Sequence, residues 1–360
     1  MVLLRTALPS ISTKFRERFA SGKELGARLS RAEALGLAIA AGALVISLAI
    51  YEWLPITPND YKAYTNTARG FFDGFYYAYW ILPAFQVLDR LPFVVGYGLL
   101  NLLNILGVLF AARVFGGRGG LALLSFQMLY VILLGSITGI LVGALALAWW
   151  GLNRERWLVA GIGLALAGIK PQLGGTLGLI LWLLAPGTAR DKVNSLIVPT
   201  FVAVASLIAY PGWPAELLSR LLTSPPNQWG SITLWDWIGP AALLLWLPPL
   251  LLPMRPSRRF VALVAANALA LPYFQQTDLL ALFTVVNGWL PAVLGNLGYL
   301  FFAFKFDAFE LLVVIPAIVY GAALAPSARR WWQRDHRLGI NAERSPLAFM
   351  MKDGPTDNER

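Results

Sequence analysis

The sequence contains apolar stretches that are too long to belong to the core of a soluble domain. Residues 119–153 carry no charged side chain, whereas one membrane-crossing helix needs only about 20 apolar residues. Over the whole chain, 58% of the residues are hydrophobic and 13% are charged, and a soluble domain averages about 25% charged residues. We therefore expect a membrane protein whose chain crosses the bilayer several times.

The pattern of these stretches indicates which secondary structure crosses the membrane. Backbone amides in lipid must form hydrogen bonds within the chain, so only helices or a closed barrel can span it. The apolar residues here are continuous rather than alternating with polar ones, which favours helices. We expect an all-α polytopic transmembrane protein, in which residues 119–153 form two short helices that turn near residues 135–139.

The basic residues between the apolar stretches predict the orientation of the chain. Short loops rich in Lys and Arg are typical of the cytoplasmic side. Counted from a basic segment at residues 1–33, the apolar stretches predict about ten to twelve spans in a membrane domain at residues 34–326. Both termini are then cytoplasmic, and the end of the tail at residues 327–360 is expected to be disordered. The result is a multi-pass cell-membrane protein, surrounded by membrane lipids, with a large external first loop at residues 52–91.

Several kinds of chemistry are excluded or disfavoured by composition. The chain has no cysteine, and its one histidine, His336, lies in the charged tail. Disulfides and cysteine metal sites are therefore excluded, and a Ser-His-Asp triad is not expected. No Asp-x-Asp pair stands in a polar loop to hold a metal-bound nucleotide. No cofactor is expected, and a divalent metal is not indicated but stays open.

The net charge of +10 does not point to a nucleic-acid partner. The basic residues are scattered over several loops, whereas a nucleic-acid site concentrates them on one surface. The positive-inside rule accounts for their distribution instead. The chain also lacks the Gly-x-x-x-x-Gly-Lys-Ser/Thr phosphate loop, so ATP-driven work within it is not expected.

Charged residues on the predicted external side are the main candidates for a site. Asp60, Lys170, Asp236 and Asp278 are carried by four different segments. A charge near hydrocarbon costs about 2.5–3.5 kcal/mol on insertion scales, and such residues usually pair or line a wet cavity. Two interpretations stay open: interfacial ion pairs, such as Asp60 or Asp278 with Lys170, or a functional cavity that combines a carboxylate base with a cationic phosphate site.

Two further features of the external segments bear on this choice. Lys170 follows a short apolar run, residues 157–169, so it is expected to lie just below the external interface and to extend its ammonium toward water. The aromatic run at residues 71–80 is either an interfacial belt or the lining of a sugar or lipid site.

The segment from Asp60 to Gly74 resembles the first-loop motif of glycosyltransferase family 87, the alpha-mannosyltransferase-like group of the GT-C fold. In that motif an acidic residue opens the loop, a tyrosine follows four positions later, as Tyr64 does here, and a helix of small residues ends in glycine. The resemblance extends over roughly residues 35–300. Further similar segments occur in the family's order: Leu91-Pro92 with Asn101 and Asn104, Arg154-Glu155-Arg156, Ile169-Lys170-Pro171, Leu271-Pro272-Tyr273, and Asp278-Leu279.

The resemblance implies a membrane glycosyltransferase that takes mannose or another hexose from a polyprenyl-phosphate donor. The acceptor would be a hydroxyl of a lipid or glycan on the non-cytoplasmic side, and the anomeric centre would invert. Asp60 would be the general base, and Lys170 and Arg69 would bind the donor phosphate. The sugar or acceptor contacts would come from Tyr64, Tyr273 and Asp278.

The chain departs from the family's common pattern in two places, and both are positions where sugar hydroxyls would be contacted. One is the outer turn with Gly135, Ser136 and Gly139, and the other is Gln275-Gln276-Thr277. The identity of the donor or acceptor therefore stays open. Two other functional classes also stay open. A lipid or sugar transporter would tend toward repeated halves, which the sequence does not show. A non-catalytic subunit of a membrane complex would have no cavity lined by Asp60 and Lys170.

Overall fold

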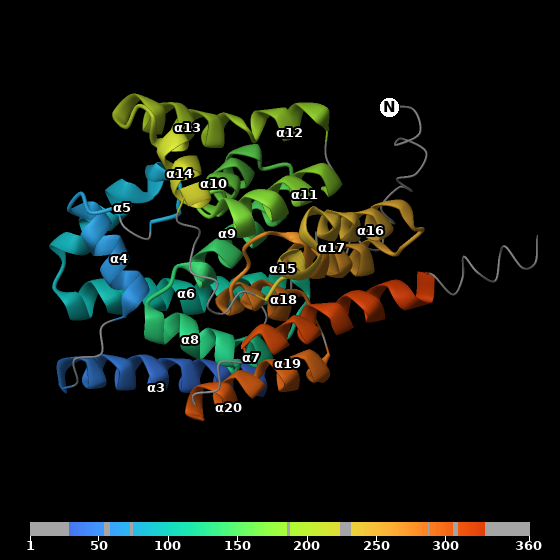
Figure 1. The fold of residues 1–360 in the computed structure, drawn as a ribbon, viewed down its shortest axis with the longest axis horizontal. Coiled ribbons are helices and arrows are strands. Elements are labelled where there is room, and N and C mark those ends of the chain that lie inside the picture. Colours follow the sequence, from blue (N-terminus) through green and yellow to red (C-terminus); the bar gives the residue numbers. More distant parts are fainter. Residues whose placement is uncertain are drawn as a thin grey trace, which may run out of the picture.

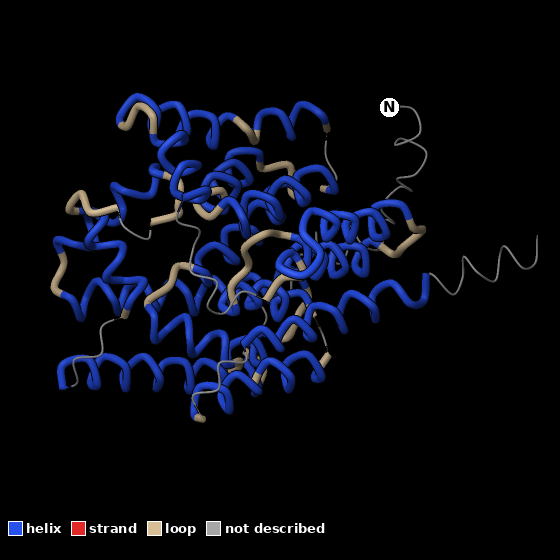
Figure 2. Tube along the Cα trace, viewed as in Figure 1, coloured by secondary structure: helices blue, strands red, loops and turns tan. Residues whose placement is uncertain are grey.

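The computed structural model describes residues 29–53, 58–72, 75–185, 188–223, 232–286, 288–304 and 309–327. Within these ranges the regular structure is helical, and no β-strand is present (Figure 2). The all-α prediction is confirmed for this part of the chain. The terminal segments expected to be cytoplasmic lie almost entirely outside the described residues, as does His336.

Three helical stretches are long and apolar enough to cross a membrane: α3 (Arg31–Trp53), α6 (Phe93–Phe115) and residues Ala189–Ala209, which comprise α12 (Ala189–Asn194) and α13 (Ile197–Ala209). They expose large apolar side chains, for example Val45, which is 65% exposed, and Phe201, which is 71% exposed. Contiguous exposed apolar surface of this kind is suited to contact with lipid. These helices indicate a membrane protein.

A sharply bent pair of helices provides a fourth candidate span. The chain bends by 115° between α8 (Phe126–Leu134) and α9 (Thr138–Asn153). The bend lies at Gly135, whose φ of +64° is a left-handed conformation that favours glycine. This turn confirms the two helices predicted for residues 119–153, and the structure adds the short α7 (Gly119–Leu123) before them.

Three further apolar helices are shorter than these spans: Trp157–Ala167, Pro171–Leu184 and Leu311–Ser327. The total of about ten to twelve spans stays a prediction. The predicted external loop at residues 52–91 is partly helical, because it contains α4 (Asn59–Ala68), η1 (Tyr79–Ile81) and α5 (Leu82–Arg90).

The remaining described elements form the second half of the chain: α10 (Trp157–Ala167), the π-helical turn η2 (Pro171–Gly175), α11 (Thr176–Leu184), α14 (Trp213–Thr223), α15 (Trp235–Ile238), η3 (Gly239–Trp246), α16 (Leu247–Leu251), α17 (Pro256–Ala270), η4 (Gln276–Leu279), α18 (Leu280–Val285), α19 (Trp289–Gly295), α20 (Leu297–Ala303) and η5 (Phe309–Val313).

One end of the helix bundle gathers basic residues from distant segments. Arg113, near the end of α6, pairs with Glu33 at the start of α3 at 3.1 Å. Phe260, in the first half of α17, stacks with Trp149 near the end of α9, and it also lies 4.9 Å from Phe115 between ring centroids. The basic loops that flank these helices in the sequence therefore meet at one end of the bundle.

The opposite end of the bundle carries α4 and α5. Tyr51 near the end of α3 stacks on Phe93 at the start of α6 with 4.0 Å between ring centroids, and Tyr61 of α4 packs edge-on against the same ring. In Figure 1, α3 and α6 run along the long axis of the molecule, and α4 and α5 lie at its left end.

The bundle is held closely together by glycines where α6 crosses α9. A Cβ atom on Gly107 would lie 2.5 Å from the carbonyl oxygen of Gly139, and one on Gly143 would lie 2.7 Å from Cα of Gly107. These distances leave no room for a side chain. The close approach fixes the position of the first turn of α9, which carries Thr138.

This packing predicts opposite effects for the same substitution at two positions of α6. Gly107→Ala should destabilise the protein by about 1–3 kcal/mol, because the new methyl group overlaps the backbone of α9. A methyl group on Gly98 would meet nothing within 4 Å, so Gly98→Ala should stabilise the helix by about 0.5–1 kcal/mol. Thermal unfolding of the purified protein in detergent measures both, and equal shifts would contradict the close approach.

Candidate functional site

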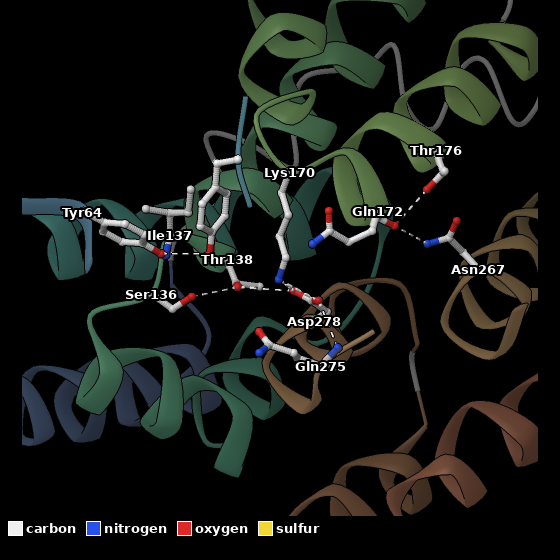
Figure 3. A network of polar contacts seen from close by, with 11 residues as sticks. Tyr64, Ser136, Ile137, Thr138, Lys170, Gln172, Thr176, Asn267, Gln275 and Asp278 are labelled. Carbon is white, nitrogen blue, oxygen red and sulfur yellow. Dashed lines mark hydrogen bonds and ion pairs between the residues drawn. The ribbon is translucent and has the colours of Figure 1, made fainter. Parts of the chain in front are cut away.

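The most deeply buried charges of the described chain form an ion pair. Lys170 Nζ lies 2.6 Å from Asp278 Oδ1 and 2.8 Å from Asp278 Oδ2, and the two side chains are 2% and 0% exposed (Figure 3). The expectation that Lys170 reaches out to the external interface is wrong. A carboxylate far along the chain neutralises the ammonium inside the protein, so the ammonium does not need water. Of the two interpretations, ion pairing is confirmed for Lys170 and Asp278.

Local backbone structure places both partners. Lys170 stands between α10 and the π-helical turn η2, where Pro171 lacks the N–H that would continue an α-helix. Its own carbonyl oxygen accepts the N–H of Gly174 at 2.8 Å. Asp278 caps η4, since its Oδ2 accepts the backbone N–H of Gln275 at 3.2 Å. The local turn around each residue thus fixes the backbone position from which its charged side chain extends toward the other.

Two hydroxyl groups extend the network away from the ion pair. Thr138 Oγ1 donates to Asp278 Oδ1 at 3.5 Å, and it lies 3.1 Å from Ser136 Oγ. Both residues are buried; Ser136 lies in the turn between α8 and α9, and Thr138 is the first residue of α9. Ser136 also acts on Asp60 through a side-chain hydrogen bond. The hydroxyls therefore connect two carboxylates that lie in different segments of the chain.

Asp60 is the partly buried acid of the cluster. It is the second residue of α4. Burial raises the pKa of Asp60 to about 6, while the positive charge of Lys170 and the hydrogen bond with Ser136 lower it and the negative charge of Asp278 raises it. Asp60 therefore lies within electrostatic reach of the ion pair. A carboxyl group with a pKa near the working pH is suited to proton transfer.

Three tyrosines surround Asp60. The hydroxyls of Tyr64 and Tyr77 lie 3.2 Å apart, and the backbone N–H of Ile137 donates to the Tyr64 hydroxyl. Burial raises the pKa of both groups, and the charge of Asp60 adds to the effect. Burial also raises the pKa of the half-buried Tyr273, with further contributions from Tyr77 and both carboxylates. These hydroxyls stay protonated and can donate hydrogen bonds to oxygen atoms.

Polar atoms without a protein partner lie next to Asp278 in the sequence. Gln276 Oε1 and Thr277 Oγ1 are buried and have no hydrogen-bond partner among the described residues. Asn267 Oδ1 is in the same situation, although its Nδ2 donates to the carbonyl oxygen of Gln172 beside the cluster (Figure 3). Buried polar groups are normally satisfied. These atoms can therefore accept hydrogen bonds from a polar ligand or from water.

The structure brings together five of the six predicted site residues and leaves one outside. Arg69 is not in the cluster, because its guanidinium pairs with Asp89 at 2.8 Å and its side chain is 60% exposed. The predicted external Asp236 lies exposed on α15. The five that converge are Asp60, Tyr64, Lys170, Tyr273 and Asp278.

Three members of the cluster were missed by the sequence interpretation. Ser136 and Thr138 carry no charge, and the only signal for them was the departure from the family pattern at the outer turn. Tyr77 stood within an aromatic run that an interfacial belt would also explain. No group of three or more His, Cys, Asp or Glu residues that could hold a metal ion occurs in the described ranges.

Comparison of the chain with family models, with curated proteins and with solved structures gave no match. The fold and the site therefore define the class of protein by themselves. It is a helical membrane protein with a buried Lys–Asp ion pair, linked through hydroxyl groups to a carboxyl group of raised pKa.

The ion pair predicts a non-additive effect of substitutions on stability. Lys170→Met or Asp278→Asn alone should cost about 3–5 kcal/mol, because each leaves the other charge buried without its partner. The double variant should be more stable than either single variant, since no unpaired charge remains. Unfolding in detergent measures this coupling. Arg69→Ala, which breaks the exposed pair with Asp89, is the control and should change stability far less than either single variant.

Proposed function

We propose that the chain is a membrane glycosyltransferase of the GT-C type, which moves mannose or another hexose from a polyprenyl-phosphate donor to an acceptor hydroxyl. One observation carries the proposal: Asp60, a partly buried carboxyl group with a pKa of about 6, stands beside the buried pair of Lys170 and Asp278. This arrangement supplies a base and a cation at one place. The resemblance of residues 60–74 to the first loop of family 87 supports the same reaction class.

The proposed reaction is a single displacement. The carboxylate of Asp60 takes the proton of the acceptor hydroxyl, and the oxygen attacks the anomeric carbon. The bond between that carbon and the phosphate oxygen breaks, and its electron pair leaves with the polyprenyl phosphate. Because attack comes from the face opposite the phosphate, the anomeric configuration inverts. The proton on Asp60 is later released to water.

Lys170 would stabilise the departing phosphate without leaving Asp278. An ammonium group has three N–H donors, and Asp278 takes hydrogen bonds from Lys170 on both carboxylate oxygens. The remaining donor capacity is available to a phosphate oxygen. Asp278 is then a residue that positions Lys170 and not a sugar ligand. Arg69 is left out of the proposed site because Asp89 holds its guanidinium.

The sugar would be bound by the neutral polar groups of the cluster. Tyr64 is one candidate, and the half-buried Tyr273 is another. The unpaired oxygen atoms of Gln276 and Thr277 are suited to accept hydrogen bonds from sugar hydroxyls. The two places where the chain departs from the family pattern thus supply candidate sugar contacts, Ser136 at the outer turn and Gln276 and Thr277 at the late segment.

The two ends of the bundle support an assignment of sides. Basic loops meet at the end where α3 begins and α6 ends, and the positive-inside rule assigns such an end to the cytoplasm. Asp60 and its neighbours lie where α4 contacts the start of α6, so the site would open on the non-cytoplasmic side. Cytoplasmic termini and about ten to twelve spans remain part of this proposal.

The decisive experiment incubates the purified protein with polyprenyl-phosphate sugars and candidate lipid or glycan acceptors. Release of polyprenyl phosphate together with a glycosylated acceptor supports the proposal. Movement of a labelled substrate across vesicles without bond cleavage would instead identify a transporter. Neither activity over a panel of donors would favour a non-catalytic subunit.

Asp60→Asn should lower kcat/KM by at least about a hundredfold, the contribution expected of a general base. In the wild-type protein, base catalysis needs the ionised carboxylate, so kcat/KM should rise with pH through about 6 and then level off. Initial rates across pH test both expectations. Asp89→Asn, an acid of the neighbouring helix α5 that pairs with Arg69, is the matched control and should retain activity. Full activity of Asp60→Asn would remove Asp60 as the base.

Ser136→Ala should shift the pH profile without removing the base. The hydrogen bond from Ser136 lowers the pKa of Asp60, so its loss should raise that pKa and move the inflection of kcat/KM to higher pH. Because the base remains, the plateau of kcat/KM at high pH should fall by much less than in Asp60→Asn, even with the loss of a candidate sugar contact. Thr65→Ala, which removes a hydroxyl that donates to the Lys62 carbonyl of its own helix, should leave the profile unchanged. An unshifted profile for Ser136→Ala would contradict the link between the two residues.

A further inference from the structure

Part of the aromatic run at residues 71–80 is buried inside the protein and packs against α14. Phe75 is fully buried, and Tyr79 is 2% exposed. The rings of Phe72 and Tyr79 are stacked, with centroids 5.0 Å apart and planes inclined by 7°. The two ends of the segment 72–79 therefore meet. Tyr77 lies between these ends in the sequence, and its hydroxyl is 3.2 Å from that of Tyr64 in the candidate site.

Arg220 of α14 contacts both ends of this segment. Its Nη2 donates to the Tyr79 hydroxyl at 2.8 Å, and its Nη1 donates to the Phe72 carbonyl at 3.4 Å. The guanidinium also lies over the two stacked rings, with Cζ 5.2 Å from the centroid of Phe72 and 5.9 Å from that of Tyr79. A planar guanidinium with several N–H donors is suited to bind two acceptors at once.

The Tyr79 hydroxyl is also bonded to Glu216, which precedes Arg220 by one helical turn. Tyr79 donates to Glu216 Oε2 at 3.1 Å, and Arg220 Nη2 donates to the same oxygen at 3.1 Å. An ion pair as exposed as that of Glu216 and Arg220 contributes little to stability by itself. Trp213, at the start of α14, stacks on the Tyr79 ring as well. These contacts together hold Tyr79 in one orientation.

The buried ring of Phe75 connects Tyr79 with Tyr77. Its centroid lies 5.8 Å from that of Tyr79 and 5.3 Å from that of Tyr77. Between the two tyrosines, the N–H of Ala78 donates to the carbonyl of Ile169 at 2.9 Å. Residues 75–78 form no helix, so no helical hydrogen bonds hold Tyr77. Its position therefore depends on the contacts made by its neighbours.

The hydroxyl pair of Tyr64 and Tyr77 has an O–H donor to offer. One of the two hydroxyls donates to the other, and the Tyr64 oxygen also accepts the N–H of Ile137. Each hydroxyl has a single hydrogen, so only one of the two hydrogens is used within the pair. The other can donate to an oxygen atom of a sugar.

We propose that Tyr77 binds the transferred sugar and that Tyr79, Glu216 and Arg220 are positioning residues, which act on the sugar only through Tyr77. The inference rests on the proposed function for its substrate. It adds a sugar contact to that function, and it gives the aromatic run and α14 a part in it.

The kinetic test uses Tyr79→Phe, which removes the hydroxyl and keeps the stacked ring. KM for the polyprenyl-phosphate sugar should rise about two- to tenfold, the range expected when one neutral hydrogen bond is displaced. The value of kcat should change much less. A purely structural role would instead reduce the amount of active protein, and so lower kcat at an unchanged KM. Arg220→Gln tests the same link from α14, and unchanged KM in both variants would overturn the proposal.

A cycle of single and double variants tests whether Tyr79 acts through Tyr77. In the Tyr77→Phe background, Tyr79→Phe should raise KM by less than about twofold, because the hydroxyl that it positions is already absent. Equal rises in the two backgrounds would overturn the proposal. Tyr320→Phe is the matched control, since it removes a hydroxyl that donates to the Leu245 carbonyl at 2.6 Å outside the site. It should leave KM unchanged.

A measurement without substrate separates this inference from the transferase proposal. A fluorinated tyrosine incorporated at position 77 reports the surroundings of that ring by fluorine NMR of the full-length protein in detergent. Its resonance should shift or broaden in Tyr79→Phe and Arg220→Gln, and not in Tyr320→Phe. An unchanged resonance would overturn the positioning role even in a protein that transfers sugar. A changed resonance in a protein that transfers no sugar would support the positioning of Tyr77 and remove only the proposed function.

Discussion

The buried contact between Lys170 and Asp278 is the interaction on which the rest of the site depends. Moving two charges out of water is costly, and their attraction offsets that cost only when the remaining hydrogen-bonding capacity is satisfied. Thr138 and the backbone of Gln275 supply that capacity on the carboxylate side. The pair therefore joins the turn after α10, the first turn of α9 and η4 into one polar unit inside an apolar bundle.

Backbone packing between α6 and α9 also positions this polar unit, in addition to its hydrogen bonds. Gly107 and Gly139 allow α6 and α9 to touch, and Gly135 adopts the left-handed turn that leads into Ser136. Buried hydroxyls and amides along this contact are bonded to backbone groups, for example Asn104 to the carbonyl of Ser136. The shape of the helices thus decides which side chains can face Asp60. Burial then raises the pKa of Asp60, and the charge of Lys170 partly offsets that increase.

The sequence was a good guide to which charged residues converge and a poorer guide to how those residues interact. Asp60, Lys170 and Asp278 were expected on one side because counting spans and basic loops needs no partner information. The ion pair joins residues far apart in the chain. The spacing of apolar residues along the sequence does not indicate with which carboxylate a buried lysine will pair. Arg69 was grouped with the converging residues, whereas the structure pairs it with Asp89 on α5, a partner on another helix that no spacing in the sequence indicates. Ser136 and Thr138 were missed because hydroxyl residues in an apolar turn have no distinctive charge or spacing.

The separation of Lys170 and Asp278 by 108 residues has a consequence for biogenesis. The ribosome adds about 5–20 residues per second, so the ammonium enters the membrane roughly 5 to 20 s before its carboxylate has been synthesised. During that interval Lys170 lacks the carboxylate that neutralises it, so its ammonium is expected to lie near headgroups or water. Assembly of the first half is thus completed by the last third of the chain, and a truncated product would keep a charge that its own helices cannot neutralise.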